Sequence, residues 1–149
     1  MITDMNISVK LLDTNAKLPV YGTDFSAGAD LYACSESPVE IGPGQSCIIR
    51  TGIAVQIPEG YAGFVFARSG MASKQGLAPS NKVGVIDSDY RGEIMVSLYN
   101  HSQQSRTVSN GDRIAQIVIM PYVKAVWDIM PELDDSLRGD GGFGSTGIS

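Results

Sequence analysis

The amino-acid sequence predicts an all-β protein whose short strands form a barrel or a sandwich. Short apolar runs recur along the chain, separated by glycine, proline, asparagine and aspartate, a pattern that is typical of such folds. A helical pattern is confined to one segment, residues 69–74. No repeat, linker or low-complexity block divides the 149 residues before their glycine-rich end, so we expect one hydrophobic core.

Apolar alternation locates the strands. In residues 7–11, Ile7, Val9 and Leu11 alternate with Ser8 and Lys10, as on a half-buried strand. Comparable apolar runs follow, and we expect strands there as well: residues 46–57, 61–67, 92–100 and 113–123.

Turn and cap residues complete the predicted elements. Asn110 and Gly111 form the kind of pair that a tight hairpin favours. In the helical segment, Ser69 is a candidate N-cap and Gly76 a candidate helix end. We therefore expect one short helix among the strands.

Charge and cysteine usage exclude several classes of protein. The net charge of -5 argues against binding along a nucleic-acid backbone, which requires a basic face. No apolar run approaches the roughly 20 residues of a membrane span, and the first residues do not resemble a secretory signal. Cys34 and Cys47 have no metal-binding spacing and are interpreted as core residues. We expect a soluble, cytoplasmic protein without nucleic-acid or membrane partners.

The densest group of reactive side chains lies in "NKVGVIDSDYRGE", residues 81–93. Its apolar start places Asp87 at a strand end, followed by a turn that contains Tyr90. A turn rich in aspartate and glycine is usually only a turn, but a large ring is unusual there. An aromatic ring beside a carboxylate suits a small planar ligand and a general base.

Other polar positions suggest an anion site. Arg68 stands directly before the helical segment, where a guanidinium and free backbone N–H groups attract anions. Asp30 follows small residues at a strand entrance, which is also consistent with a simple turn aspartate. Gln116 interrupts an apolar strand, so it either satisfies buried backbone or contacts a ligand.

The end of the chain, "RGDGGFGSTG" at residues 138–147, combines many glycines with an arginine, a phenylalanine and hydroxyl residues. Chain ends fray unless they are tied down, so a disordered tail is one interpretation. The side chains are unusual for a tail that serves only solubility. The other interpretation is a lid whose glycines act as hinges and which closes on a ligand.

Together, "SAGADLYA", "ARSGMASK", "NKVGVIDSDYRGE", "NGDRIAQIVI" and "RGDGGFGSTG" resemble, in order and spacing, the sequence motifs of the trimeric dUTPases. The resemblance implies a jelly-roll-like, distorted β-barrel over residues 1–137 and a flexible arm over residues 138–149. It also implies a homotrimer with shared active sites. The implied reaction is the Mg²⁺-dependent hydrolysis of dUTP to dUMP and diphosphate, which limits uracil in DNA and supplies dUMP for dTMP synthesis.

The resemblance implies a role for each matching residue in the body of the chain. Asp87 resembles the general base that activates the attacking water, and Tyr90 the ring that packs on deoxyribose. Asp30 would lie near Mg²⁺, bound through water. The uracil would be read by Asn81 and by backbone groups around Val85, Ile86 and Met95, whereas the phosphates would be bound by Arg68, Ser69, Gly70 and Gln116.

The resemblance also assigns roles within the arm. Arg138 would contact the phosphates, and Phe143 would stack on the uracil. The amides and hydroxyls of Gly144, Ser145 and Thr146 would bind the β and γ phosphates.

Two alternatives remain open at this point. The dCTP deaminases share the fold, but a glutamate of that family corresponds to Ser97 here, and their arginine loop tends to read Arg-Ser-Ser instead of "RSG". A non-catalytic nucleotide-sensing or regulatory protein with a dUTPase-like surface is the second alternative. Both differences from the deaminases favour the pyrophosphatase.

Overall fold

The computed structural model describes residues 4–142. It confirms the all-β expectation, with strands joined by turns and one short helical turn, η1. The elements are β1 Ser8–Leu11, β2 Val20–Tyr21, β3 Ala29–Tyr32, β4 Val39–Ile41, β5 Ser46–Arg50, β6 Ile53–Gln56, β7 Tyr61–Phe66, η1 Met71–Gln75, β8 Leu77–Pro79, β9 Gly84–Ile86, β10 Met95–Asn100, β11 Arg106–Val108 and β12 Arg113–Pro121.

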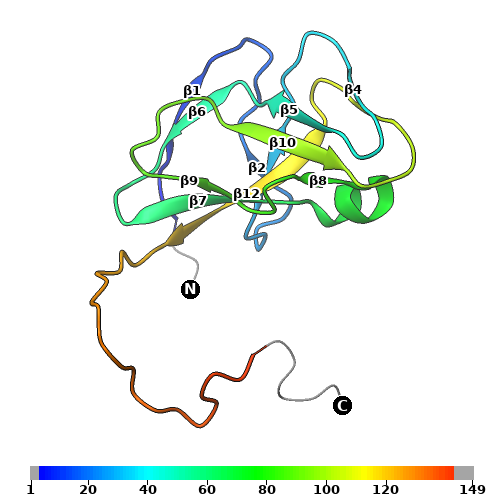
Figure 1. Cartoon of the computed structure of the whole chain (residues 1–149). Coiled ribbons are helices and arrows are strands. Elements are labelled where there is room, and N and C mark those ends of the chain that lie inside the picture. Colours follow the sequence, from blue (N-terminus) through cyan, green and yellow to red (C-terminus); the bar gives the residue numbers. More distant parts are fainter. Residues whose placement is uncertain (1–3, 143–149) are drawn as a thin grey trace.

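The strands form small antiparallel sheets wrapped around one core, in a jelly-roll-like arrangement (Figure 1). The largest sheet has five strands in the order β2-β3-β12-β7-β9. A second sheet has the order β5-β10-β8, and the pairs β1-β6 and β11-β4 complete the body. Most neighbouring strands in these sheets are distant in sequence. For example, the long strand β12 lies between β3 and β7.

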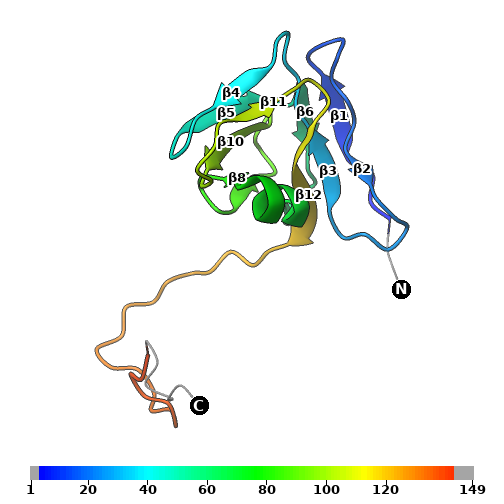
Figure 2. The same cartoon turned by 90° about the vertical axis from the view of Figure 1, so that its right-hand side faces the viewer.

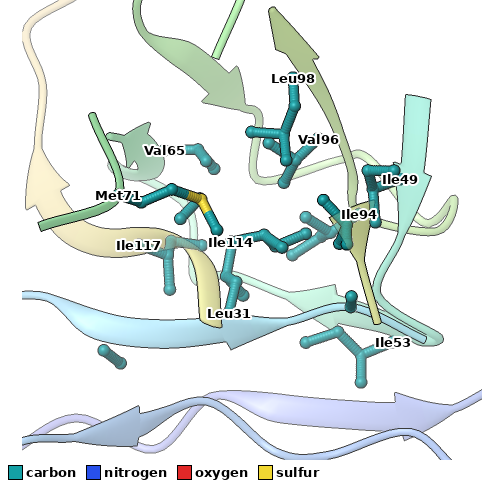
Figure 3. Close-up of a cluster of buried hydrophobic side chains, with 14 of the residues drawn as sticks. Leu31, Ile49, Ile53, Val65, Met71, Ile94, Val96, Leu98, Ile114 and Ile117 are labelled. Carbon is teal, nitrogen blue, oxygen red and sulfur yellow. The ribbon is translucent and has the colours of Figure 1, made fainter. Parts of the chain in front are cut away.

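The core fills the space between the sheets, and Figure 3 shows its central side chains. Val96 and Leu98 of β10 point inward, toward residues of the five-stranded sheet such as Leu31 and Ile114. These four side chains are at most 2% exposed. Burial of each side chain contributes about 1.5–3 kcal/mol to the stability of the fold. This packing fixes the strands in place, including those whose ends carry polar residues.

The helical segment differs in detail from the sequence-based expectation. Its helix covers Met71–Gln75 and is a π-helical turn, and no side chain caps its start, so the assignment of Ser69 as N-cap is wrong. Gly76 ends the helix with a left-handed φ of 71°, as expected. Met71 is buried in the core, and this packing anchors the loop that carries Arg68.

The turn at Asn110 and Gly111 does not form the expected hairpin. β11, before the turn, pairs with β4, whereas β12, after it, pairs with β3 and β7. Gly111 has φ 82° and donates its N–H to the Ala33 carbonyl at 2.8 Å. The glycine is therefore used to cross between two sheets.

After β12, the chain leaves the body as an extended segment, seen in both views (Figures 1 and 2). Over residues 122–142 it has turns but neither helix nor strand. Several of its apolar side chains are almost fully exposed, among them Val126, Trp127, Ile129 and Leu133.

The two cysteines are free, with Cys34 buried and Cys47 half-buried. No helix within residues 4–142 is long and apolar enough to cross a membrane.

Burial of Cys34, followed by the nearby Asp13 carboxylate, raises the pKa of its thiol. At pH values above the ordinary thiol pKa, the unfolded chain releases this proton and the folded protein keeps it. The free energy of unfolding should therefore fall with rising pH there, by at most about 1.4 kcal/mol per unit from this group. We expect urea midpoints measured at pH 7 and pH 10 to differ more for the wild type than for Cys34→Ala. Equal differences would contradict this prediction.

Candidate functional site

A first hollow lies between the edge strand β9 and strand β10, and we name it the β9 hollow. Its volume is about 290 Å³. Most of the residues expected to bind a nucleoside are brought together here. The lining consists of Val65, Pro79, Asn81, Gly84, Val85, Ile86, Asp87, Tyr90, Glu93, Met95, Val96 and Ser97.

Asp87 reaches the β9 hollow because it directly follows β9, whose pairing with β7 fixes the strand end. Its side chain is exposed. Among residues 4–142, its carboxylate has no hydrogen-bond or ion-pair partner, and a turn closes behind it from the Tyr90 N–H to the Asp87 carbonyl at 3.2 Å. A carboxylate without such partners is free to accept a hydrogen bond from water.

The segment from β9 to β10 is not a regular hairpin. β9 pairs with β7, whereas β10 pairs with β5 and β8. The β9 hollow therefore opens where the edges of two sheets diverge. This leaves room for a flat ligand between Val85, which is 57% exposed, and Met95, which is 50% exposed.

The sequence interpretation missed several residues of this hollow. Ser97 lines it, and its hydroxyl accepts a hydrogen bond from Ser80 Oγ at 2.7 Å. Glu93 also lines it, but its carboxylate is engaged with Gly52 and Arg50, and this contact raises the pKa of Arg50. Two features of the sequence could have indicated these residues. Ser97 lies in the strand that follows the aspartate-rich turn, and Glu93 directly follows that turn.

A second hollow of about 520 Å³ contains the residues expected to bind phosphate, and we name it the β3 hollow. Its centre is Asp30 in β3, whose carboxylate accepts hydrogen bonds from Arg68 Nε at 2.6 Å and from Arg113 Nη1 at 3.4 Å. The full lining is Gly22, Ser26, Ala27, Gly28, Asp30, Phe66, Arg68, Ser69, Gly70, Arg113, Gln116 and Val118.

The charged side chains that line the β3 hollow are two arginines and one aspartate, a set that favours anions. Arg68 is 25% exposed and Arg113 is 55% exposed, so both guanidinium groups keep access to solvent. Arg113 was not among the residues expected in the site, although it belongs to one of the motifs. An arriving polyanion can take over these N–H donors, and the freed Asp30 carboxylate can then bind a cation.

Gln116 lies between Asp30 and Phe66 in the five-stranded sheet. Its Nε2 donates to the Ala67 carbonyl at 2.9 Å, so it satisfies backbone next to Arg68. Its Oε1 fills the space where a Cβ on residue 28 would stand, which explains Gly28. Gln116 thus holds the arginine loop and also faces the hollow.

The two hollows lie at separate places on the five-stranded sheet. The β9 hollow is at its edge, where Gly84, Val85 and Ile86 line it, whereas the β3 hollow is lined from the paired strands β3, β12 and β7. The strands β9 and β3 are also separated by β7 and β12, which corresponds to about 14 Å between their axes. Asp87 and Arg68 of one chain are therefore not brought together around one ligand.

The arm takes part in neither hollow in the part of the chain that the structure describes. Arg138 Nε donates to the Gly141 carbonyl within the arm at 2.7 Å. Gly139 has φ 56°, in the region that favours glycine. The other expected arm residues, Phe143, Gly144, Ser145 and Thr146, lie outside the described residues.

A carboxylate cage for a metal is absent from the described part of the chain, since no group of three or more histidine, cysteine, aspartate or glutamate side chains forms one there. The donors that exist suit a magnesium ion bound mainly by ligand oxygens and water, with one carboxylate nearby. Asp30 is such a carboxylate, 14% exposed and flanked by Arg68 and Arg113.

Comparison with known proteins agrees with this geometry. The dUTPase family model matches residues 14–147. The deoxyuridine 5'-triphosphate nucleotidohydrolase of Desulfitobacterium hafniense is 51% identical over 138 residues, covering 92% of this chain and 91% of that protein. The corresponding protein of Hahella chejuensis is 48% identical over 139 residues, covering 93% and 91%.

Solved structures show the same arrangement of the chain. The dUTPase of Staphylococcus bacteriophage 80alpha, solved with dUPNHPP, superposes with a TM-score of 0.88 at 30% identity. The superposition covers 96% of this chain and 99% of the phage chain. With the family model matching most of its length and the motif residues gathered in the two hollows, the chain belongs to the dUTPase family.

Proposed function

We propose that the protein hydrolyses dUTP to dUMP and diphosphate, which limits uracil in DNA and supplies dUMP for dTMP synthesis. One observation supports this most strongly: an unpartnered carboxylate, Asp87, shares a hollow with Tyr90 and with an edge strand suited to a flat base. The enzymes that carry the name deoxyuridine 5'-triphosphate nucleotidohydrolase are similar to this chain over almost its whole length.

Asp87 is the proposed general base. Its carboxylate accepts a proton from a water that attacks the α-phosphorus in line with the departing diphosphate. The new bond joins this water oxygen to phosphorus, and the α–β bridging oxygen leaves with the diphosphate. An exposed carboxylate without a protein partner suits this task because its oxygens are free to accept hydrogen bonds from water.

The proposed nucleoside site is the β9 hollow. Tyr90 packs against the deoxyribose, and Asn81 reads the uracil edge together with backbone groups of Val85, Ile86 and Met95. A narrow slot rejects a 5-methyl group by shape and a 4-amino group by leaving hydrogen bonds unmade. Phe143 of the arm would cover the uracil ring.

The proposed triphosphate site is the β3 hollow. Arg68, Ser69, Gly70 and Gln116 bind phosphate oxygens there, and Arg138, Gly144, Ser145 and Thr146 of an arm join them. Bound Mg²⁺ would neutralise charge on the phosphates, with Asp30 holding one of its waters. Positive charge in this hollow stabilises the oxygens on which negative charge builds in the transition state.

A complete site on this proposal requires more than one subunit. Because two strands, β7 and β12, separate the two hollows of a chain, the β9 hollow of one subunit must meet the β3 hollow of another. A closed ring of three subunits makes three such sites from one type of contact. The exposed apolar residues of the extended segment 122–142, such as Trp127, supply a surface for this assembly.

The direct test offers dUTP, dCTP, dTTP and UTP separately with Mg²⁺ and follows both diphosphate and ammonia. Diphosphate from dUTP alone supports the proposal. Ammonia from dCTP would instead identify a deaminase, and no product from any nucleotide would indicate a binding protein.

Mixing two inactive variants tests the shared site. We expect Asp87→Asn and Arg68→Ala each to abolish most activity, and their 1:1 mixture, unfolded and refolded together, to recover about a quarter of wild-type activity. About one site in four then joins an intact β9 hollow to an intact β3 hollow if trimers form at random. If mixed trimers, confirmed by mass, recover no activity, the proposal of a site shared between subunits is wrong. Refolded wild type is the control.

A further inference from the structure

The ring of Tyr90 folds back onto the backbone of its own turn. A Cβ added to Gly92 would lie 2.6 Å from Cζ of the ring and 3.0 Å from Cε2. Both distances are shorter than normal carbon contacts, so the ring and any side chain at position 92 exclude each other. Gly92 is not among the glycines with positive φ, so its backbone does not demand glycine. The Tyr90 ring is the reason for a glycine here.

A hydrogen bond holds the far end of the same ring. Tyr90 Oη donates to the Glu93 carbonyl at 3.0 Å. Tyr90 is therefore held at three points. Its backbone N–H is bound in the turn, its ring atoms Cζ and Cε2 pack against Gly92, and its hydroxyl is bound to the Glu93 carbonyl. A side chain that is 40% exposed is rarely restrained at so many points.

The carbonyl that anchors Tyr90 is itself fixed to the body of the fold. The Glu93 side chain is 16% exposed and accepts the Gly52 N–H at 2.8 Å and Arg50 Nε at 3.1 and 3.2 Å. The next residue, Ile94, is fully buried, and its N–H donates to the Ile53 carbonyl at 2.8 Å. Because these contacts occupy the Glu93 carboxylate, it serves as an anchor and not as a second base.

We propose that Gly92 and Glu93 are positioning residues that hold the Tyr90 ring at a fixed height above the sugar and thereby determine the preference for deoxyribose over ribose. The inference rests on the proposed function, in which Tyr90 packs on the sugar. A ring held in this position clashes with a 2′-hydroxyl, whereas a ring that can move away leaves space for one.

The test compares kcat/KM for dUTP with kcat/KM for UTP. Gly92→Ala forces the ring off its seat, so we expect this ratio to fall by about ten- to a hundredfold. Tyr90→Phe removes only the hydroxyl, and Glu93→Gln weakens only the anchor, so each should lower the ratio by about three- to tenfold. Gly42→Ala and Glu40→Gln are matched controls outside both hollows and should leave the ratio unchanged.

The same substitution made in a Tyr90→Ala variant separates an effect on the position of the ring from general damage to the fold. In Tyr90→Ala no ring remains to be displaced, so adding Gly92→Ala should not change the ratio further. The proposal is overturned if Gly92→Ala lowers the ratio equally in both backgrounds, or if it lowers kcat/KM for both nucleotides by the same factor. Should Gly92→Ala fail to fold, Tyr90→Phe and Glu93→Gln decide the matter, and unchanged ratios in both would overturn the proposal. A wild type without dUTP hydrolysis would instead show that the proposed function is wrong.

Discussion

Asp87→Asn is expected to lower kcat for dUTP by about two to four orders of magnitude, because the attacking water loses its base. The amide occupies the same volume and leaves the β9 hollow intact. Nucleotide affinity, measured by calorimetry with dUpNHpp, should therefore change little. This separation of kcat from binding is the signature of a group that acts on the reacting atoms.

Asp89→Asn is the matched control for Asp87→Asn. Asp89 lies two residues further in the same turn and is exposed, but it does not line the β9 hollow. It should retain wild-type kcat. A full rate in Asp87→Asn, or an equal loss in both variants, would remove Asp87 from the chemical step.

Removal of residues 138–149 is expected to reduce kcat/KM for dUTP by about a hundredfold or more while the fold remains intact. The last strand ends at Pro121, and the core residues all precede it, so unfolding should be unaffected. The loss has two physical sources on our proposal: Arg138 no longer contacts phosphate, and the bound nucleotide is no longer shielded from bulk water.

Two shorter changes identify the part of the arm that matters. Deletion of residues 148–149 alone, beyond the last motif, should leave kcat/KM unchanged. Arg138→Ala should reproduce part of the loss in kcat/KM, because only the contact between Arg138 and the phosphates is removed. A truncated protein, with its assembly state verified by light scattering, that still hydrolyses dUTP at the full rate would exclude the arm from catalysis.

Local sequence patterns were sufficient for the strands and for the placement of Asp87. Apolar alternation identified Ser8–Leu11 as a strand, although Leu11 is 53% exposed. In Met95–Asn100 every second residue is buried, which leaves a direct trace in the sequence. The aspartate after an apolar run was correctly expected at a strand end, and Gly76 at a helix end. These features depend on a few neighbouring residues and their backbone preferences.

Features that depend on distant contacts were missed or misjudged. Asn110 and Gly111 have hairpin composition, yet their flanking strands β11 and β12 belong to different sheets and pair with strands distant in sequence. The continuous apolar run of residues 46–57 divides into β5 and β6, which pair with β10 and β1. Arg113 joined the site only through its contact with Asp30, a residue 83 positions away.

The sequence by itself determined the strand-rich class, the family resemblance and the identity of the groups that can perform the chemistry. Only the tertiary structure decided that these groups occupy two separate hollows on one sheet, and that Gly92 and Glu93 hold Tyr90 in place. The physical reason is that side-chain type is encoded locally, whereas the meeting of strands such as β7, β9 and β10 is set by packing of the whole chain around its core.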